Sequence, residues 1–252
     1  MTSMQIEAKN LGMRYATGRL ALQSASFTVS AGEFAVILGA NGSGKSTMMR
    51  IIAGITKPTD GEVRLGGQTI TTLSGRDLAK ARMGLGMVFQ HANLVKRRSV
   101  IANVVCGTLG RHRNLLTSLG FLPKSEFGHA MQCLERVGLT KFAHQRASTL
   151  SGGQAQRASI ARALAQRPGA LLADEPIASL DPEASEEVMR LLRQLAKEEG
   201  MAVLAVLHQP ELARRYADRL LGLRKGVISF ADAPAQVSDS QIDSLYEGFH
   251  PA

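Results

Sequence analysis

The chain has 252 residues, of which 44% are hydrophobic and 20% charged, so it can form one or two folded domains and is too apolar for global disorder. With 30 Lys and Arg against 21 Asp and Glu, the net charge of +9 favours anionic partners without choosing among nucleotide, nucleic acid and anionic lipid. No apolar run approaches the roughly 18 residues of a membrane span, and no secretory leader is expected. The two cysteines, Cys106 and Cys133, and six scattered histidines predict neither a disulfide framework nor a metal held in a protein cage.

Strand-like and helix-like segments alternate along the chain, which favours an α/β fold. In the first part we expect strands over 5–15, 21–29 and 33–38, a helix over 45–55, and strands over 62–65, 68–70 and 87–90. Residues 92–149 are expected to be mostly helical, with loops at 107–110 and 119–123. In the last part we expect helices over 155–167, 186–197 and 211–216, and strands over 170–173, 202–207, 219–223 and 227–230. The middle of the chain is therefore predicted to be a helical insertion.

A glycine-rich turn follows the apolar strand expected at 33–38 and leads into the next helix. Its sequence, GANGSGKST at 39–47, has the spacing of a phosphate-binding loop. Backbone amides and the helix N-terminus attract an anion, the lysine reaches the β- and γ-phosphates, and the following hydroxyl can ligate Mg²⁺. The predicted nucleotide-binding residues are Gly39, Asn41, Gly42, Ser43, Gly44, Lys45, Ser46 and Thr47, with Lys45 also catalytic and Ser46 also a metal ligand.

Two acids, Asp174 and Glu175, end the buried strand expected at 170–173. Ligands of open α/β folds bind at the carboxyl ends of the strands, so these acids are expected near the phosphate loop. We expect Asp174 to hold Mg²⁺ through its hydration shell and Glu175 to orient the attacking water or accept its proton.

The pentapeptide LSGGQ at 150–154 stands just before a helix, where Ser151, Gly152, Gly153 and Gln154 would form a second anion site. With the phosphate loop and the acid pair, it resembles the ATP-binding subunit of ABC transporters. The resemblance implies a P-loop NTPase core with an antiparallel β subdomain and an inserted helical subdomain. It implies one ABC ATPase domain over 1–252, with the nucleotide-binding core in 1–91 and 159–252 and the helical subdomain in 92–158. It also implies a head-to-tail dimer in which residues 151–154 of one copy contact the ATP held by the other.

Four further residues match positions that are characteristic of this family. Gln90 would contact Mg²⁺ and the attacking water, and His208 the γ-phosphate. Asp181, in the loop after the acid pair, would lie at the dimer interface, and Tyr15 would stack on adenine. Taken alone, Tyr15 is also compatible with a core position, and His208 with an ordinary core or surface histidine.

Finer features resemble the phosphonate-importer branch, which is shared with phosphite-type systems; one is LHQ at 207–209, where THD is common in the family. The resemblance implies two membrane-spanning permease subunits, a periplasmic solute-binding protein and a peripheral position on the cytoplasmic face of the bacterial inner membrane. A short permease helix would enter a cleft after Gln90, with Leu94 and Val95 as contacts. The basic triplet Lys96–Arg98 would face the permease or lipid headgroups, or form a solvated surface. ATPases of other importers (phosphite, phosphate) or of exporters stay as alternatives. DNA- or ribosome-linked ABC proteins and P-loop kinases or GTPases fit less well, and no nucleic acid is expected.

Overall fold

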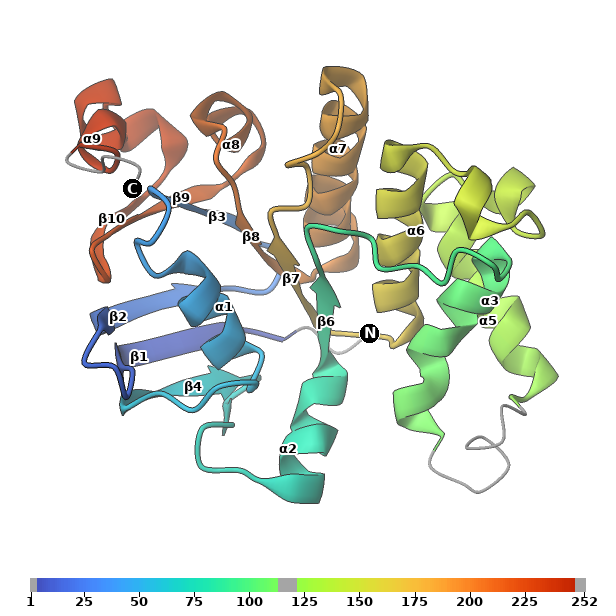
Figure 1. Ribbon diagram of the computed structural model, residues 1–252, viewed down its shortest axis with the longest axis horizontal. Coiled ribbons are helices and arrows are strands. Elements are labelled where there is room, and N and C mark those ends of the chain that lie inside the picture. The colour runs from blue at the N-terminus through green and yellow to red at the C-terminus, as the bar shows by residue number, and fades with distance from the viewer. Residues whose placement is uncertain (1–3, 113–121, 248–252) are drawn as a thin grey trace.

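A computed structural model describes residues 4–112 and 122–247 of the chain. Its larger sheet has the strand order β10-β9-β3-β8-β7-β6 (Figure 1). Neighbouring strands run parallel, except that β10 is antiparallel to β9. The strands are β3 (Phe34–Leu38), β6 (Leu85–Val88), β7 (Ala170–Asp174), β8 (Ala202–Val206), β9 (Arg219–Arg224) and β10 (Val227–Asp232). Because β3 and β8 lie in the middle of the sheet and are covered on both faces, their sequences are continuous apolar runs, FAVIL and AVLAV.

A second sheet has the order β2-β1-β4-β5 and is antiparallel, as the family resemblance implies for the β subdomain. Its strands are β1 (Ile6–Arg14), β2 (Leu20–Val29), β4 (Asp60–Leu65) and β5 (Gln68–Thr69). Helix α1 (Lys45–Ile52) buries Met48, Met49, Ile51 and Ile52 in a core shared with both sheets. Ala35 and Ile37 of β3 belong to that core, whereas Phe34, Val36 and Leu38 enter a core on the other face, since successive side chains of a strand point to opposite sides.

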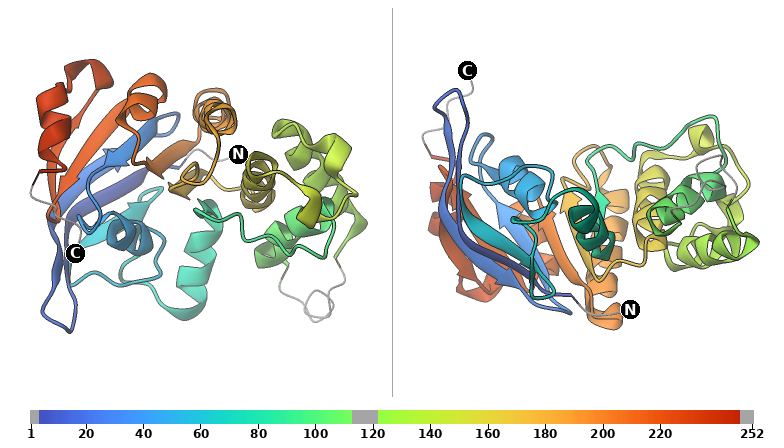
Figure 2. Two further views of the ribbon diagram at one scale, coloured as in Figure 1. Left: turned by 45° about the horizontal axis from the view of Figure 1, so that its top comes forward. Right: turned by 90° about the horizontal axis from the view of Figure 1, so that it is seen from below.

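The core on the other face of the larger sheet is covered by helices and continues without a break into the helical part of the molecule. There α3, α5 and α6 pack against one another, away from the antiparallel sheet (Figures 1 and 2). The helices are α2 (Gly75–Ala81), α3 (Val100–Val105), α5 (Lys124–Arg136), α6 (Gly152–Ala165), α7 (Pro182–Glu199), α8 (Pro210–Tyr216) and α9 (Asp239–Ser244), with short 3₁₀ turns at Arg82–Gly84, Thr140–Phe142, Ala147–Thr149 and Pro234–Gln236. The observed architecture is therefore a P-loop NTPase fold with an antiparallel β-sheet and a helical part added to it. The predicted boundary between residues 158 and 159 falls inside α6, and the division into subdomains stays a prediction.

Several expected elements differ in extent. The strand expected at 87–90 is wrong in its bounds, because β6 stops at Val88 and the chain then leaves the sheet. The loop expected at 107–110 is the 3₁₀ helix η2 (Cys106–Arg111). Gly107 allows η2 to pack closely on α6, since a Cβ on it would lie 2.0 Å from the carbonyl oxygen of Arg162 in α6. Helix α7 begins at Pro182, four residues before the expected start, because Asp181 caps it. Of the loop expected at 119–123, residues 119–121 lie outside the described part.

Candidate functional site

The phosphate loop joins β3 to α1, and its conformation depends on glycine. Gly44 has a φ of +114°, and a Cβ on it would lie 2.5 Å from the carbonyl oxygen of Ala21 in β2. The Lys45 ammonium donates to the carbonyl oxygens of Gly39 at 2.7 Å and Ala40 at 2.9 Å. Burial lowers the pKa of Lys45, while the charges of Glu175 and Asp174 act in the opposite direction. A buried cation therefore lies at the centre of the loop, facing two carboxylates.

A pocket of about 160 Å³ opens over this loop. It is lined by Arg19, Ala21, Asn41, Gly42, Gly44, Lys45, Ser46, Thr47 and Glu175. Seven of these residues were predicted from the sequence, whereas Arg19 and Ala21 were not. The hydroxyl oxygen of Ser43 is buried and has no hydrogen-bond partner among the described residues, so the loop holds a donor that a bound anion would satisfy.

The Tyr15 side chain lies beside the same loop. Tyr15 directly follows β1, and its hydroxyl lies 3.0 Å from Oγ1 of Thr47. It is half-buried, so its ring is at the edge of the site and not in the core. The alternative of a core position is therefore excluded, while stacking on adenine stays a prediction.

The acid pair stands at the carboxyl end of β7, next to the phosphate loop. One carboxylate oxygen of Asp174 is buried and has no hydrogen-bond partner among the described residues. Burial, and next the charge of Glu175, raise the pKa of Asp174, against the lowering effect of Arg50, Lys45 and His208. An unpaired buried carboxylate oxygen fits a hydrated Mg²⁺ that also contacts phosphate oxygens, since this ion is usually bound by one or two carboxylates and several waters. Ser46, which is exposed in the pocket, offers the neighbouring hydroxyl.

Glu175 adopts a left-handed backbone conformation, with a φ of +50°, and its carboxylate meets His208. The distance from Oε1 of Glu175 to Nε2 of His208 is 2.7 Å. The pairing follows from the sheet, because β7 and β8 are parallel neighbours with Asp174 beside Val206, and both residues follow these strand ends. The predicted base and the predicted phosphate-sensing histidine are thus in direct contact.

Gln90 follows the neighbouring edge strand, β6. β6 pairs with β7 up to Val88 and Ala173, and Gln90 lies two residues beyond that point with an exposed side chain. The carboxyl ends of β3, β6, β7 and β8 therefore bring the phosphate loop, Gln90, the acid pair and His208 to one edge of the sheet (Figure 1).

The motif at 151–154 forms the start of α6. Ser151 and Gln154 make a reciprocal capping box, with distances of 3.3 Å from the Gln154 amide to the serine Oγ and 3.0 Å from the Ser151 amide to the glutamine Oε1. Gly153 packs against α7, since a Cβ on it would lie 2.7 Å from that of Ala184. Asp181 caps α7 by accepting from the Ala184 amide at 2.9 Å. None of the residues that line the phosphate-loop pocket comes from this motif, so within one chain the motif lies outside that pocket.

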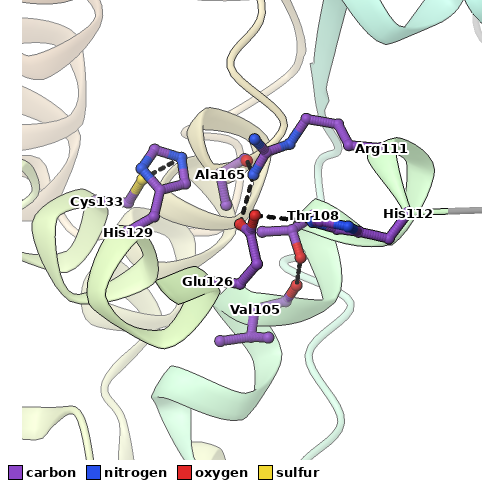
Figure 3. A network of polar contacts seen from close by, with 8 residues as sticks. All are labelled: Val105, Thr108, Arg111, His112, Glu126, His129, Cys133 and Ala165. Carbon is purple, nitrogen blue, oxygen red and sulfur yellow. Dashed lines mark hydrogen bonds and ion pairs between the residues drawn. The ribbon is translucent and has the colours of Figure 1, made fainter. Parts of the chain in front are cut away.

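A further buried carboxylate, which the sequence analysis did not identify, lies in the helical part (Figure 3). Glu126 of α5 is 6% exposed and bonds to Arg111 at 2.6 Å and to Nε2 of His112 at 2.8 Å. Arg111 also donates to the carbonyl oxygen of Ala165 at the end of α6. Burial acts to raise the pKa of Glu126, but the His112 hydrogen bond and the charges of Arg111, His112 and His129 outweigh it and hold the pKa below its ordinary value. The cluster ties α5 to η2 and α6.

A second pocket, of about 440 Å³, lies between α6, η2 and the segment before Gln90. Its apolar lining includes Ile55, Met83, Met87 and Phe89. Ile55 is 51% and Phe89 40% exposed, so both present apolar surface at this groove. Leu94 and Val95, predicted to contact a partner here, do not line the pocket: Leu94 packs on the core, and Val95 is exposed elsewhere.

Comparisons with known proteins agree with this geometry. The model of the family described as ABC transporter matches residues 22–178. The phosphonates import ATP-binding protein PhnC of Treponema denticola is 45% identical over 236 residues, which cover 94% of this chain and 92% of that protein. The protein of the same name from Shouchella clausii is 43% identical over 241 residues, covering 96% of this chain and 91% of that protein.

Solved structures extend the likeness to the fold. MJ1267 in its ADP conformation, an ATP-binding cassette of an ABC transporter, has a TM-score of 0.85 and 28% identity, covering 98% of this chain and 100% of that chain. A dimeric post-hydrolysis state of the ATP-binding cassette MJ0796, bound to ADP and Pi, has a TM-score of 0.78 and 34% identity, covering 91% of this chain and 98% of that chain.

Proposed function

Because this chain belongs to the ABC transporter family, we propose that it is the ATP-hydrolysing subunit of an importer for phosphonates or a related phosphorus oxyanion. One observation carries the hydrolytic part: Glu175 lines the phosphate-loop pocket and contacts His208 at 2.7 Å. The solute class is supported by relatives named as phosphonate import proteins at 43–45% identity over almost the whole chain.

In this proposal the phosphate loop binds the ATP phosphates, with Lys45 at the β- and γ-phosphates and Tyr15 against adenine. Ser46, Asp174 and Gln90 hold Mg²⁺, which when bound neutralises charge on the phosphates. The unpartnered oxygen of Asp174 supports this assignment. The unpartnered hydroxyl of Ser43 supports phosphate binding in the same way.

Hydrolysis needs a water placed in line with the γ-phosphate. We assign its orientation and deprotonation to Glu175, whose carboxylate is fixed by His208, and contact with the γ-phosphate to His208. Lys45 adds positive charge at the phosphates. Because little covalent chemistry is left for the protein, placement and electrostatics supply most of the acceleration.

The second half of each site would come from another copy of the chain. Ser151, Gly152, Gly153 and Gln154 lie at a helix N-terminus outside the phosphate-loop pocket, and Asp181 lies beside them at the start of α7. A helix N-terminus favours a negative phosphate. A head-to-tail dimer would place these residues on the ATP of the partner, and the dimeric MJ0796 cassette supports such an assembly.

Two permease subunits would carry the solute, fed by a periplasmic binding protein. The apolar groove with Ile55, Met87 and Phe89 is the surface we assign to a permease helix, since Phe89 directly precedes Gln90 and so links the groove to the nucleotide. Across the described residues no helix combines the length and the apolar character of a bilayer crossing. The proposed permease partners would hold the chain at the cytoplasmic face of the inner membrane.

The test is growth of cells that lack this chain, supplied with wild type or Glu175→Gln, on phosphonate, phosphite or phosphate as the only phosphorus source. Growth on phosphonate with wild type alone is the expected result. Rescue on phosphite only would keep the mechanism and change the solute. Equal growth of both strains on every source, with the chain present, would refute the import role and favour an exporter.

A further inference from the structure

Helix α6 holds the main chain on both sides of Gln90. Gln156, in the second turn of α6, is 3% exposed and donates from Nε2 to the carbonyl oxygen of Phe89 at 2.9 Å. Phe89 directly precedes Gln90, and its own side chain is 40% exposed, so the carbonyl is the point of attachment. A buried amide is expected to have such a partner, because leaving it unpaired is costly.

The second attachment lies just after Gln90. Arg162, six residues further along α6, donates to the carbonyl oxygens of Ala92 at 2.8 Å and Asn93 at 2.7 Å. Asn93 has a φ of +48°, so the chain turns at the point where the guanidinium holds it. Between these attachments only Gln90 and His91 are left, which restricts where the Gln90 side chain can point.

No sheet pairing provides this support. β6 is an edge strand whose pairing with β7 ends at Val88 and Ala173, two residues before Gln90. The contact from Gln156 is therefore the first fixed point after the strand. A small change at this contact would move the Gln90 amide relative to Asp174, which stays anchored in β7.

We propose that Gln156 is a positioning residue: it holds the main chain beside Gln90 so that the Gln90 side chain can contact the Mg²⁺ and the attacking water. The inference rests on the proposed function, since it needs Gln90 to act at the metal. Because α6 begins with Ser151–Gly153, binding of these residues to a partner's ATP would displace the same helix that holds Gln90. Formation of the dimer and the placement of Gln90 would then be one event.

The variants are Gln156→Leu, which removes the donor, and Gln156→Glu, which keeps the shape and replaces the amide by an acceptor. Gln166→Leu is the matched control, because Gln166 directly follows α6 and its Nε2 also donates to carbonyl oxygens, those of Arg82, Met83 and Leu85 at the start of β6. The full-length chain is assayed for ATP turnover over a Mg²⁺ series, with its melting temperature measured in parallel.

We expect both Gln156 variants to lower kcat roughly tenfold, the factor for ~1.4 kcal/mol or about one hydrogen bond, with KM for ATP unchanged. The Mg²⁺ concentration for half-maximal turnover rises, as it does in Gln90→Ala. Adding Gln156→Leu to Gln90→Ala has little further effect on kcat, because the residue acts through Gln90. Gln166→Leu lowers the melting temperature, but the Mg²⁺ dependence of its ATP turnover is the same as that of wild type.

A merely structural Gln156 would give the pattern of Gln166→Leu, or losses that add to those of Gln90→Ala, and either result overturns the inference. If the wild-type chain hydrolyses no ATP, the proposed function fails. If wild type is active and Gln90→Ala is not impaired, the metal role of Gln90 and the positioning role of Gln156 fall together.

Discussion

A methyl group added at Gly153 tests how closely the motif at the start of α6 packs on α7. The Cβ of Gly153→Ala would lie 2.7 Å from that of Ala184, about 1 Å closer than an ordinary carbon contact. Ala184 cannot move away easily, since its amide is held by the Asp181 cap at 2.9 Å. Overpacking of this kind costs about 1–3 kcal/mol, and the helical preference of alanine returns at most about 1 kcal/mol. We therefore expect a net loss of ~1–2 kcal/mol.

The assay is thermal unfolding without nucleotide, followed by circular dichroism. For a chain of this size, the loss corresponds to a fall in melting temperature of about 2–4 °C. Gly152→Ala is the control, because its Cβ would meet only the flexible end of Leu180, at 3.3 Å. Its melting temperature should equal or exceed that of wild type. Equal melting temperatures for the two variants would refute the packing argument.

Three further predictions concern charges that the structure buries. Asp174→Asn raises the melting temperature of the nucleotide-free chain and abolishes Mg²⁺-dependent turnover, because the raised pKa of Asp174 means that its ionised form destabilises the fold at neutral pH; a lower melting temperature would contradict this. Glu126→Gln costs ~2 kcal/mol in urea unfolding at pH 7, since the amide has no negative charge and only one oxygen to accept from Arg111 and His112. Because the pKa of Glu126 is lowered from its ordinary value of 4.5, its contribution to the free energy of unfolding is complete above pH 4.5 and is lost as the pH falls below that value. The difference in stability between wild type and Glu126→Gln should therefore shrink in acid. A difference that does not depend on pH would exclude the carboxylate as its cause. Lys45→Ala weakens ATP binding at least tenfold by equilibrium titration, as expected for a charge-assisted bond of ~1.5–3 kcal/mol, and unchanged affinity would remove Lys45 from the phosphate site.

The site residues that could be predicted from the sequence belong to short motifs of consecutive residues. The phosphate loop at 39–47 and the acids at 174–175 are each written in consecutive residues, next to a strand whose apolar run is visible in the sequence. The topology of a parallel sheet then brings them together, so their proximity was predictable. His208 was identified only through the family resemblance, since a single histidine after an apolar strand is also compatible with an ordinary core or surface position.

The residues that sequence reasoning missed depend on contacts between distant segments. Arg19 enters the pocket because the hairpin of β1 and β2 folds over the loop, and no motif marks it. Gln156 sits within a helix beside a recognisable motif, yet its partner is 67 residues away. The glycines at 107–110 indicate a loop by composition, but Gly107 serves a close approach to α6. Such roles follow from packing, which a single sequence does not display.

The central claim is that two copies of this chain complete each ATP site. The most direct measurement is light scattering of Glu175→Gln, which should bind ATP without hydrolysing it, at several nucleotide concentrations. We predict a monomer without nucleotide, a dimer with ATP, and a monomer with ATP when Ser151→Arg is added to place a bulky cation at the start of α6. A mass that does not respond to ATP, or a dimer that persists with Ser151→Arg, would contradict the head-to-tail site.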